Sequence, residues 1–157
     1  PVAQQDRFAV KTSIGYPSSE AEVGLLHERG DRETHRPSVD QLLQPSTLES
    51  LQDTVEEIHV AREISEYIVG IVQAIREDMR VRIGPSPRAG QQLYEISRGM
   101  ALIAGREYVV PDDIVRLLKP ALSHRIVLAD NAQAKQIATD SVIEDIQSTV
   151  TVPAVSE

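Results

Sequence analysis

The chain has 157 residues, enough for one domain with a substantial core, and only 3% of them are aromatic, so aliphatic side chains must fill that core. Sixteen basic and 24 acidic residues give a net charge of −8, which argues against extensive binding of nucleic acid or of an anionic membrane. Without cysteine the chain has no disulfide and no thiolate metal ligand. No long apolar segment and no leader pattern occur, so we expect a soluble, cytoplasmic protein.

The first predicted elements are a strand and a short helix. Along residues 8–14 apolar side chains alternate with others, which is the period of a half-buried strand. No partner strand follows nearby and the chain opens at Pro1, so we expect a fragment of a longer protein whose remaining sheet lies upstream. The sequence SEAE at residues 19–22 is a capping-box pattern and predicts a helix that ends near Gly30.

A polar, proline-containing stretch at residues 30–46 predicts a loop with one helical turn at 39–43. A second capping box, STLE at residues 46–49, predicts a helix that ends at about Glu57. We expect two short strands, at residues 58–60 and 125–128, which are candidates to pair with each other.

Three longer helices are predicted in the second half of the chain, each with one apolar face. In residues 61–79 this face consists of Ile64, Ile68, Ile71, Ile75 and Met79. In residues 87–104 it consists of Leu93, Ile96, Met100 and Ile103. The third helix starts at Pro111, and its face consists of Ile114, Leu117, Leu118 and Leu122. A last helix covers roughly 139–149, and we expect a loose tail from Val150. The pattern predicts a helix bundle with a few short strands.

The helix predicted at residues 87–104 carries an arginine in its first turn. Ser86 can cap this helix through its hydroxyl, and Pro87 suits the first helical position. A cation near a helix N-terminus is disfavoured by roughly 0.3–1 kcal/mol, so Arg88 points to an anionic partner. Residues 76–106 also hold six arginines against three acids, a local positive charge suited to a phosphate. The alternative is that these arginines pair with carboxylates elsewhere on an acidic surface.

The other candidates for chemistry have structural explanations. The four histidines lack the spacing of a metal site, so we expect none. Asp112 and Asp113 fall in a first helical turn, where carboxylates complement the helix dipole. His124 and Arg125 follow a helix, and we expect them to cap its C-terminus.

Five motifs, in this order and at this spacing, resemble the C-terminal part of the MoxR family of AAA+ ATPases: AQQDRF (3–8), SIGYPS (13–18), IGPSPRA (83–89), AGREYVVPDDI (104–114) and LSHRI (122–126). The resemblance covers roughly residues 1–153. It implies a mainly α fold, the helical lid bundle that follows an αβα nucleotide-binding core. Residues 1–17 would be the end of that core, with its arginine-finger segment and last strand. Residues 18–153 would be the lid with its sensor-2 motif, and residues 154–157 a tail.

The same resemblance implies roles for individual residues. Arg88, in the SPR motif, corresponds to the sensor-2 arginine, which reaches from the lid to the γ-phosphate of ATP in its own subunit. Arg7, in the DRF motif, corresponds to the arginine finger that enters the neighbouring subunit's site. Tyr16 and Pro17 correspond to residues near the nucleotide at the boundary of core and lid. Both arginine roles fit phosphoryl transfer, which depends on positioning and on neutralising charge at the γ-phosphate.

By resemblance, the whole protein is a ring-forming ATPase that uses ATP and Mg²⁺ for chaperone-like assembly or maturation of client proteins, often with a partner that has a von Willebrand factor A domain. This chain has no phosphate-binding loop and no strand ending in paired acids, so we expect it to bind no cofactor and to hydrolyse no ATP alone. Two alternatives remain, a helical interaction module that has lost ATP and a magnesium-chelatase-type subunit. A nucleic-acid module is disfavoured because the chain lacks an aromatic platform for bases.

Overall fold

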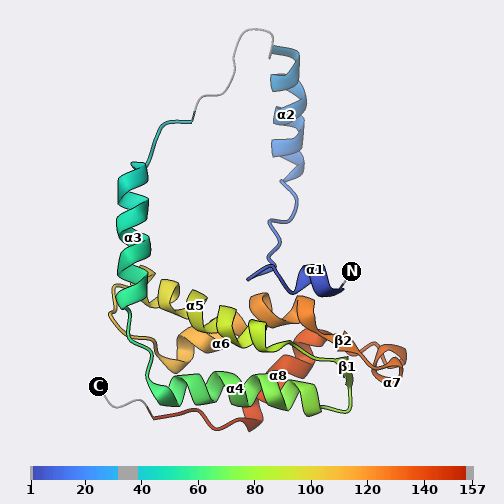
Figure 1. Cartoon of the computed structure of the whole chain (residues 1–157). Coiled ribbons are helices and arrows are strands. Elements are labelled where there is room, and N and C mark those ends of the chain that lie inside the picture. Colours follow the sequence, from blue (N-terminus) through green and yellow to red (C-terminus); the bar gives the residue numbers. More distant parts are fainter. Residues whose placement is uncertain (1, 32–38, 155–157) are drawn as a thin grey trace.

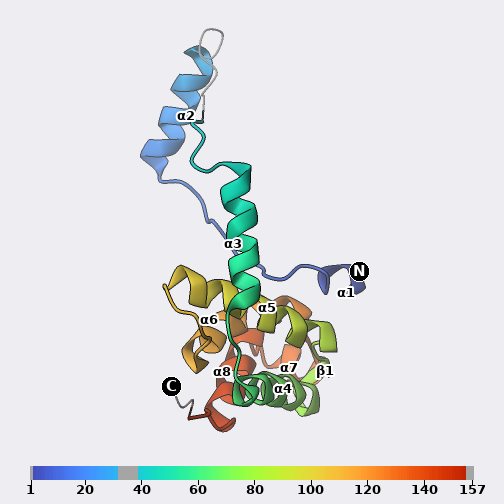
Figure 2. The ribbon, with the colours of Figure 1, turned by 60° about the vertical axis from the view of Figure 1, so that its left-hand side comes forward.

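The computed structural model describes residues 2–31 and 39–154, and most of them are helical (Figure 1). Four helices surround a common core, namely α4 (Arg62–Glu77), α5 (Pro87–Ile103), α6 (Pro111–Leu122) and α8 (Thr139–Thr149). Two more, α2 (Ser19–Asp31) and α3 (Pro45–Glu57), extend away from that core in both views (Figures 1 and 2). We call residues 58–150 the bundle and residues 8–57 the arm. None of the described helices is both long enough and apolar enough to cross a membrane.

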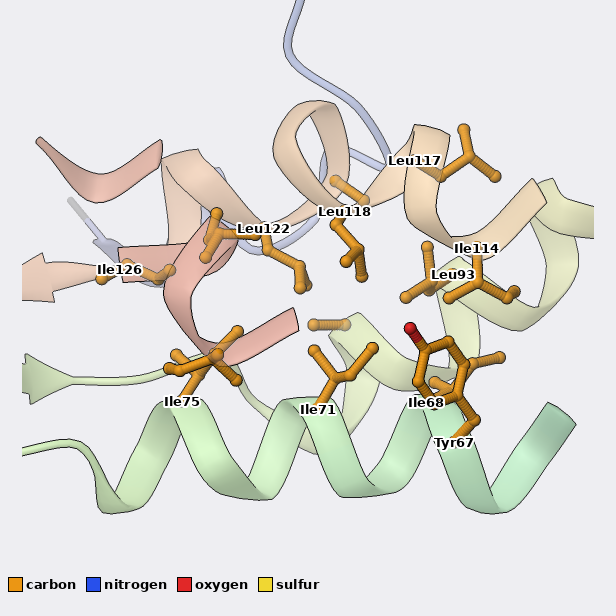
Figure 3. Packing of buried hydrophobic residues seen from close by; sticks show 14 of the residues in the cluster. Tyr67, Ile68, Ile71, Ile75, Leu93, Ile114, Leu117, Leu118, Leu122 and Ile126 are labelled. Carbon is orange, nitrogen blue, oxygen red and sulfur yellow. The ribbon is translucent and has the colours of Figure 1, made fainter. Parts of the chain in front are cut away.

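Helix α4 supplies one side of the core, with its apolar side chains directed at α6 (Figure 3). Ile64, Ile68, Ile71 and Ile75 are each at most 2% exposed, which confirms the predicted face. The helix ends at Glu77 because the next residue, Asp78, is extended and its carboxylate accepts the N–H of Arg80 at 2.8 Å. Met79 therefore lies beyond the helix and is 90% exposed, so its assignment to the core was wrong.

Helix α5 packs against α4 and α6 along a line of mostly small residues. This line consists of Ala89, Leu93, Ser97 and Ala101, spaced four apart and all fully buried. Of the face predicted from hydrophobicity, Leu93 is confirmed and Ile96 and Met100 are half-buried. Ile103, the last helical residue, is 83% exposed, and its assignment to the core was wrong. Small side chains let helix axes approach closely, a packing role that a hydrophobicity pattern does not reveal.

Helices α6 and α8 agree closely with the sequence. Pro111 is the first residue of α6, and the four predicted core residues of that helix are at most 9% exposed. Helix α8 has the predicted bounds, and it buries Val142, Ile143 and Ile146. Val150 packs against the core and is half-buried, so its assignment to a loose tail was wrong; residues 151–154 have neither helix nor strand.

The short strands pair differently from our expectation. Strand β1 (Val81–Ile83), which we did not predict, pairs antiparallel with β2 (Val127–Leu128), in the register Val81 with Leu128. Residues 58–60 instead make a single parallel bridge, between His59 and Tyr108. The predicted pairing of 58–60 with 125–128 was therefore wrong. Strands of two or three residues carry too little periodicity to specify a partner. A short helix, α7 (Asp130–Ala134), also escaped prediction.

Residues 2–31, the first stretch that the structure describes, contain no strand. After α1 (Val2–Gln5), residues 8–18 have neither helix nor strand. The prediction of a strand at residues 8–14 was therefore wrong. Phe8, Val10 and Ile14 are 67%, 44% and 101% exposed. The Lys11 N–H donates to the Pro120 carbonyl at 2.8 Å, but no ladder follows within the described residues. Alternating side chains form a strand only where a neighbouring strand accepts their backbone hydrogen bonds.

Candidate functional site

Arg88 lies in the first turn of α5, as predicted, and its side chain is exposed. Pro87 is the first helical residue, which the sequence also predicted. Ser86 occupies the N-cap position without a side-chain capping bond, so the predicted cap was wrong. Its hydroxyl donates instead to the carboxylate of Asp6 at 2.7 Å, 80 residues away in the sequence. A charged acceptor forms a stronger hydrogen bond than a backbone amide partner does.

The loop that leads into α5 is fixed against α4. A Cβ atom on Gly84 would lie 2.9 Å from Cγ and 3.0 Å from Cα of Arg76, closer than side chains tolerate. The Arg76 Nε donates to the Pro85 carbonyl at 2.6 Å. Gly84 is therefore needed for close approach, a role that sequence reasoning missed although the residue stands in the IGPSPRA motif. Gly84 and Arg76 together fix the loop before α5 and therefore the position of Arg88 in its first turn.

Arg88 differs from the other five arginines in residues 76–106. Three of these five form ion pairs, with the following N–O distances: Arg80 with Asp78 (2.7 Å) and Asp145 (2.5 Å), Arg82 with Asp130 (3.6 Å), and Arg106 with Asp113 (2.7 Å). Arg76 donates to a carbonyl, and the Arg98 guanidinium lies 6.0 Å from the centre of the Tyr94 ring. Arg88 has none of these partners among residues 2–31 and 39–154. The surface-pairing alternative thus holds for three arginines and leaves Arg88 unexplained.

Arg7 is likewise exposed, in the turn that follows α1. Its backbone is held at both ends, because its N–H donates to the Gln4 carbonyl at 3.2 Å and its carbonyl accepts from Gln92 Nε2 at 3.3 Å. Its guanidinium makes no hydrogen bond or ion pair within the part of the chain that the structure describes. Both predicted arginines thus combine a fixed backbone with a free cation.

A third arginine, Arg125, is buried between the two segments that carry Arg7 and Arg88. Its side chain is 1% exposed, and its Nε donates to the carboxylate of Asp6 at 3.1 Å. Its Nη2 donates to the carbonyls of Asp6 at 3.0 Å and Phe8 at 2.7 Å, and also to Gln92. Its Nη1 donates to the carbonyl of Ala121, so the predicted helix cap is confirmed for Arg125, whereas the His124 ring bonds to the Phe8 carbonyl instead. The contacts with Asp6 and Phe8 were not predicted from the sequence.

The surroundings of Arg125 shift its pKa in two opposite directions. Burial lowers the pKa of Arg125 below its ordinary value, and the hydrogen bond and charge of Asp6 oppose this shift. The positive charge of Arg88 lowers the same pKa further, so Arg88 lies within electrostatic reach of Arg125. Arginine remains protonated at neutral pH even so. The Arg125 guanidinium is buried and already paired with Asp6, so it is Arg88, with its exposed side chain, that can meet an anion at this end of α5.

The structure does not bring Tyr16 and Pro17 into this cluster. Both are exposed, Tyr16 to 97%, in the irregular segment that leads to α2.

Asp113 has more contacts than the predicted interaction with the helix dipole requires. It is 3% exposed, accepts two hydrogen bonds from Arg106 and one from the Val110 N–H, and so does more than complement a dipole. Within residues 2–31 and 39–154 no three His, Asp or Glu side chains group as metal ligands would.

Comparisons with known proteins agree with this architecture. The AAA lid domain family matches residues 73–146. Chaperone MoxR1 from Mycobacterium tuberculosis is 34% identical over 99% of this chain and 43% of its own length. Protein MoxR from Paracoccus denitrificans is 28% identical over 98% of this chain and 51% of its own length. The chain thus spans about half the length of the curated relatives that it matches.

A solved structure gives the same result in three dimensions. The crystal structure of a candidate ATPase from Cytophaga hutchinsonii superposes with a TM-score of 0.84 at 27% sequence identity. The superposition covers 98% of this chain and 49% of that one. A mainly helical lid bundle with a few short strands is therefore confirmed. Over nearly its whole length the chain is thus similar to the C-terminal half of MoxR proteins, and within it residues 73–146 match the AAA lid domain.

Proposed function

We propose that this chain is the lid of a ring-forming ATPase, in which Arg88 and Arg7 act at two different ATP sites. Arg88 binds the γ-phosphate of ATP held by its own subunit, and Arg7 reaches the γ-phosphate held by a neighbour. The observation that carries the proposal is the exposed side chain of Arg88 in a first helical turn, with no ion pair or side-chain hydrogen bond to residues 2–31 and 39–154. A phosphate satisfies both the guanidinium and the helix N-terminus.

The chain supplies positive charge rather than the whole site. ATP and Mg²⁺ bring the transferable phosphoryl group and neutralise part of its charge. The sequence contains no phosphate-binding loop, so the cradle for both lies in other parts of the ATPase. Tyr16 and Pro17 remain proposed contacts of the nucleotide at the boundary of core and lid. The proposed units are residues 1–17 for the end of the core, 18–153 for the lid and 154–157 for the tail.

The lid fold suits an arginine that transmits the state of the nucleotide. Arg88 stands at the start of a helix whose buried line packs against α4 and α6, so a force on Arg88 acts on the bundle as a unit. One relative is named a chaperone, which supports a role in assembling or maturing client proteins. We propose a partner with a von Willebrand factor A domain for the same task.

The test is a mixing experiment with the ATPase that contains this chain. Arg88→Ala and Arg7→Ala should each lower turnover steeply, since an arginine in trans supplies roughly 10³–10⁵ in rate in related enzymes. Each variant is then mixed with subunits that cannot bind ATP but have both arginines intact. The mixture should restore turnover to Arg7→Ala, whose own site is complete, and not to Arg88→Ala. Arg62→Ala, on the exposed side of α4, is the matched control and should keep full turnover.

Equal rescue of both variants, or of neither, would show that the assignment to own and neighbouring site is wrong. The chain by itself should bind ATP weakly or not at all and should show no turnover. Titration calorimetry of the 157 residues with ATP tests this. Micromolar affinity would contradict it, because such affinity requires a phosphate cradle within this chain.

A further inference from the structure

Arg125 fastens the N-terminal segment to the bundle. It lies in a single helical turn (Ser123–Arg125) directly after α6 and is buried there. Three of its nitrogens donate to the carboxylate of Asp6 and to the carbonyls of Asp6, Phe8 and Ala9. These acceptors lie on both sides of Arg7 in the sequence, while the Arg7 side chain takes no part. The contact thus fixes the backbone around Arg7 and leaves its guanidinium free.

Two further side chains connect this contact to α5. Gln92, in the second turn of that helix, accepts a hydrogen bond from Arg125 and donates one to the Arg7 carbonyl. Ser86, at the N-cap, donates to the carboxylate of Asp6. Ser86 and Gln92 flank Arg88 in the sequence. The backbone of Arg7 is therefore tied to the helical turns that carry Arg88.

The side chain at position 125 must be an arginine for this to work. A buried cation is strongly destabilising unless hydrogen bonds and an opposite charge compensate it. Asp6 supplies the charge, and backbone carbonyls together with Gln92 accept the remaining N–H groups. Only the guanidinium offers five donors in a planar fork, whereas a lysine offers three from one nitrogen.

We propose that Arg125 is a positioning residue for Arg7: it holds the finger segment, at the end of the core, against the lid helix that carries Arg88. This inference rests on the proposed roles of Arg7 and Arg88. It assigns Asp6, Ser86 and Gln92 to the same task. Arg125 touches neither nucleotide nor Mg²⁺ in this proposal, and it acts on turnover through Arg7 alone.

The first test needs no ATP and uses the 157-residue chain. Hydrogen exchange is measured at the amide of Lys11, which donates to Pro120, and at the amide of Phe8, which donates to Gln5. Arg125→Gln should speed exchange at both by about tenfold or more, because the segment opens locally while the bundle stays folded. Arg125→Lys should restore only part of the protection. Arg62→Gln, an exposed arginine in an ion pair within α4, should leave exchange unchanged.

A less disruptive variant keeps the test valid if Arg125→Gln fails to fold. Ser86→Ala removes one hydrogen bond to Asp6 from a half-buried position and should also speed exchange at Lys11 and Phe8, by less than Arg125→Gln does. Unchanged exchange in both Arg125→Gln and Ser86→Ala would overturn the inference. Amides within α4 and α6 report whether the bundle itself remains folded.

The second test uses the ATPase and the mixing experiment. Arg125→Gln should lower kcat with little change in the KM for ATP, and subunits that cannot bind ATP should rescue it as they rescue Arg7→Ala. Loss of overall stability would not give rescue in trans. If Arg7→Ala is rescued and Arg125→Gln is not, the positioning role is wrong and the proposed function stands. If Arg7→Ala leaves turnover unchanged, the proposed function fails, and the exchange data still decide whether Arg125 holds the segment.

Discussion

The bundle and the arm are built from similar aliphatic residues and differ in what covers them. All of the buried hydrophobic core residues lie between Ile58 and Ile146, within the bundle. In the arm, α3 buries none of its residues, and residues 8–51 hold twelve of the eighteen large hydrophobic side chains that are exposed in the described chain. Isolated helices of 13 residues are marginal in water. Local sequence signals therefore suffice to start a helix, and packing decides which region is stable.

The largest difference should follow from truncating one aliphatic residue in each region. Ile71→Ala, at a fully buried position of α4, should lower the free energy of unfolding by about 2–5 kcal/mol, through lost burial and a residual cavity. Leu48→Ala, in α3, where the side chain is 53% exposed, should change it by less than about 0.5 kcal/mol. Urea unfolding followed by circular dichroism measures both. Equal losses would mean that the arm shares the core of the bundle.

Asp112 and Asp113, adjacent in the first turn of α6, distinguish the stabilising effect of buried hydrogen bonds from that of the helix dipole. Asp113→Asn should lower the free energy of unfolding by about 1–3 kcal/mol, because it disrupts the buried contacts with Arg106 and the Val110 N–H. Asp112→Asn, in the same first turn of α6 but exposed, should cost at most about 1 kcal/mol. Thermal unfolding of the two variants gives the comparison. Equal effects would return both residues to the dipole role that the sequence suggested.

Two glycines test how tightly the bundle holds the loop and helix around Arg88. Gly84→Ala should destabilise the bundle by about 1–3 kcal/mol, because the new Cβ would lie against the backbone of Arg76. Gly99→Ala, inside α5 where the new Cβ would meet no atom within 4 Å apart from its chain neighbours and the nearby backbone of its own helix, should stabilise it by about 0.5–1 kcal/mol. Differential scanning calorimetry resolves the two signs. Tolerance of alanine at position 84 would show that the loop is free to shift.

Periodicity and proline placement predicted the long helices of the bundle well. The start of α6 at Pro111 and the bounds of α8 needed only local information, as did the position of Arg88 in a first turn. Strand β2 lies within the strand predicted at 125–128, but its partner was mispredicted because two or three residues carry no usable pairing pattern. The strand expected at 8–14 did not form, since no strand pairs with these residues in the described chain. The contacts of Arg125 with the N-terminal segment could not be predicted, since Asp6 is 119 residues away. Its place in the LSHRI motif was the one signal available.

The smallest expected effect is on the pH dependence of stability, at the junction of arm and bundle where His124 contacts Phe8. His124 Nε2 donates to the Phe8 carbonyl at 3.0 Å, and its buried Nδ1 has no partner among the described residues. Burial lowers the pKa of His124 below its ordinary value of 6.5, and the charges of Arg125 and Lys11 lower it further, against the hydrogen bond to the Phe8 carbonyl.

The unfolded chain therefore binds more protons than the folded chain as the pH falls through 6.5. The contribution of His124 to stability is complete above that pH and is lost below it. His124→Gln should lessen the loss of unfolding free energy between about pH 7.5 and about pH 5.5, since glutamine does not titrate. Asp78, whose pKa is lowered mainly by its hydrogen bond to Arg80, adds an acid loss at lower pH in every variant. His27→Gln, on the exposed surface of α2, is the control. A wild-type pH profile for His124→Gln would show that the histidine is solvated and that the junction opens in solution.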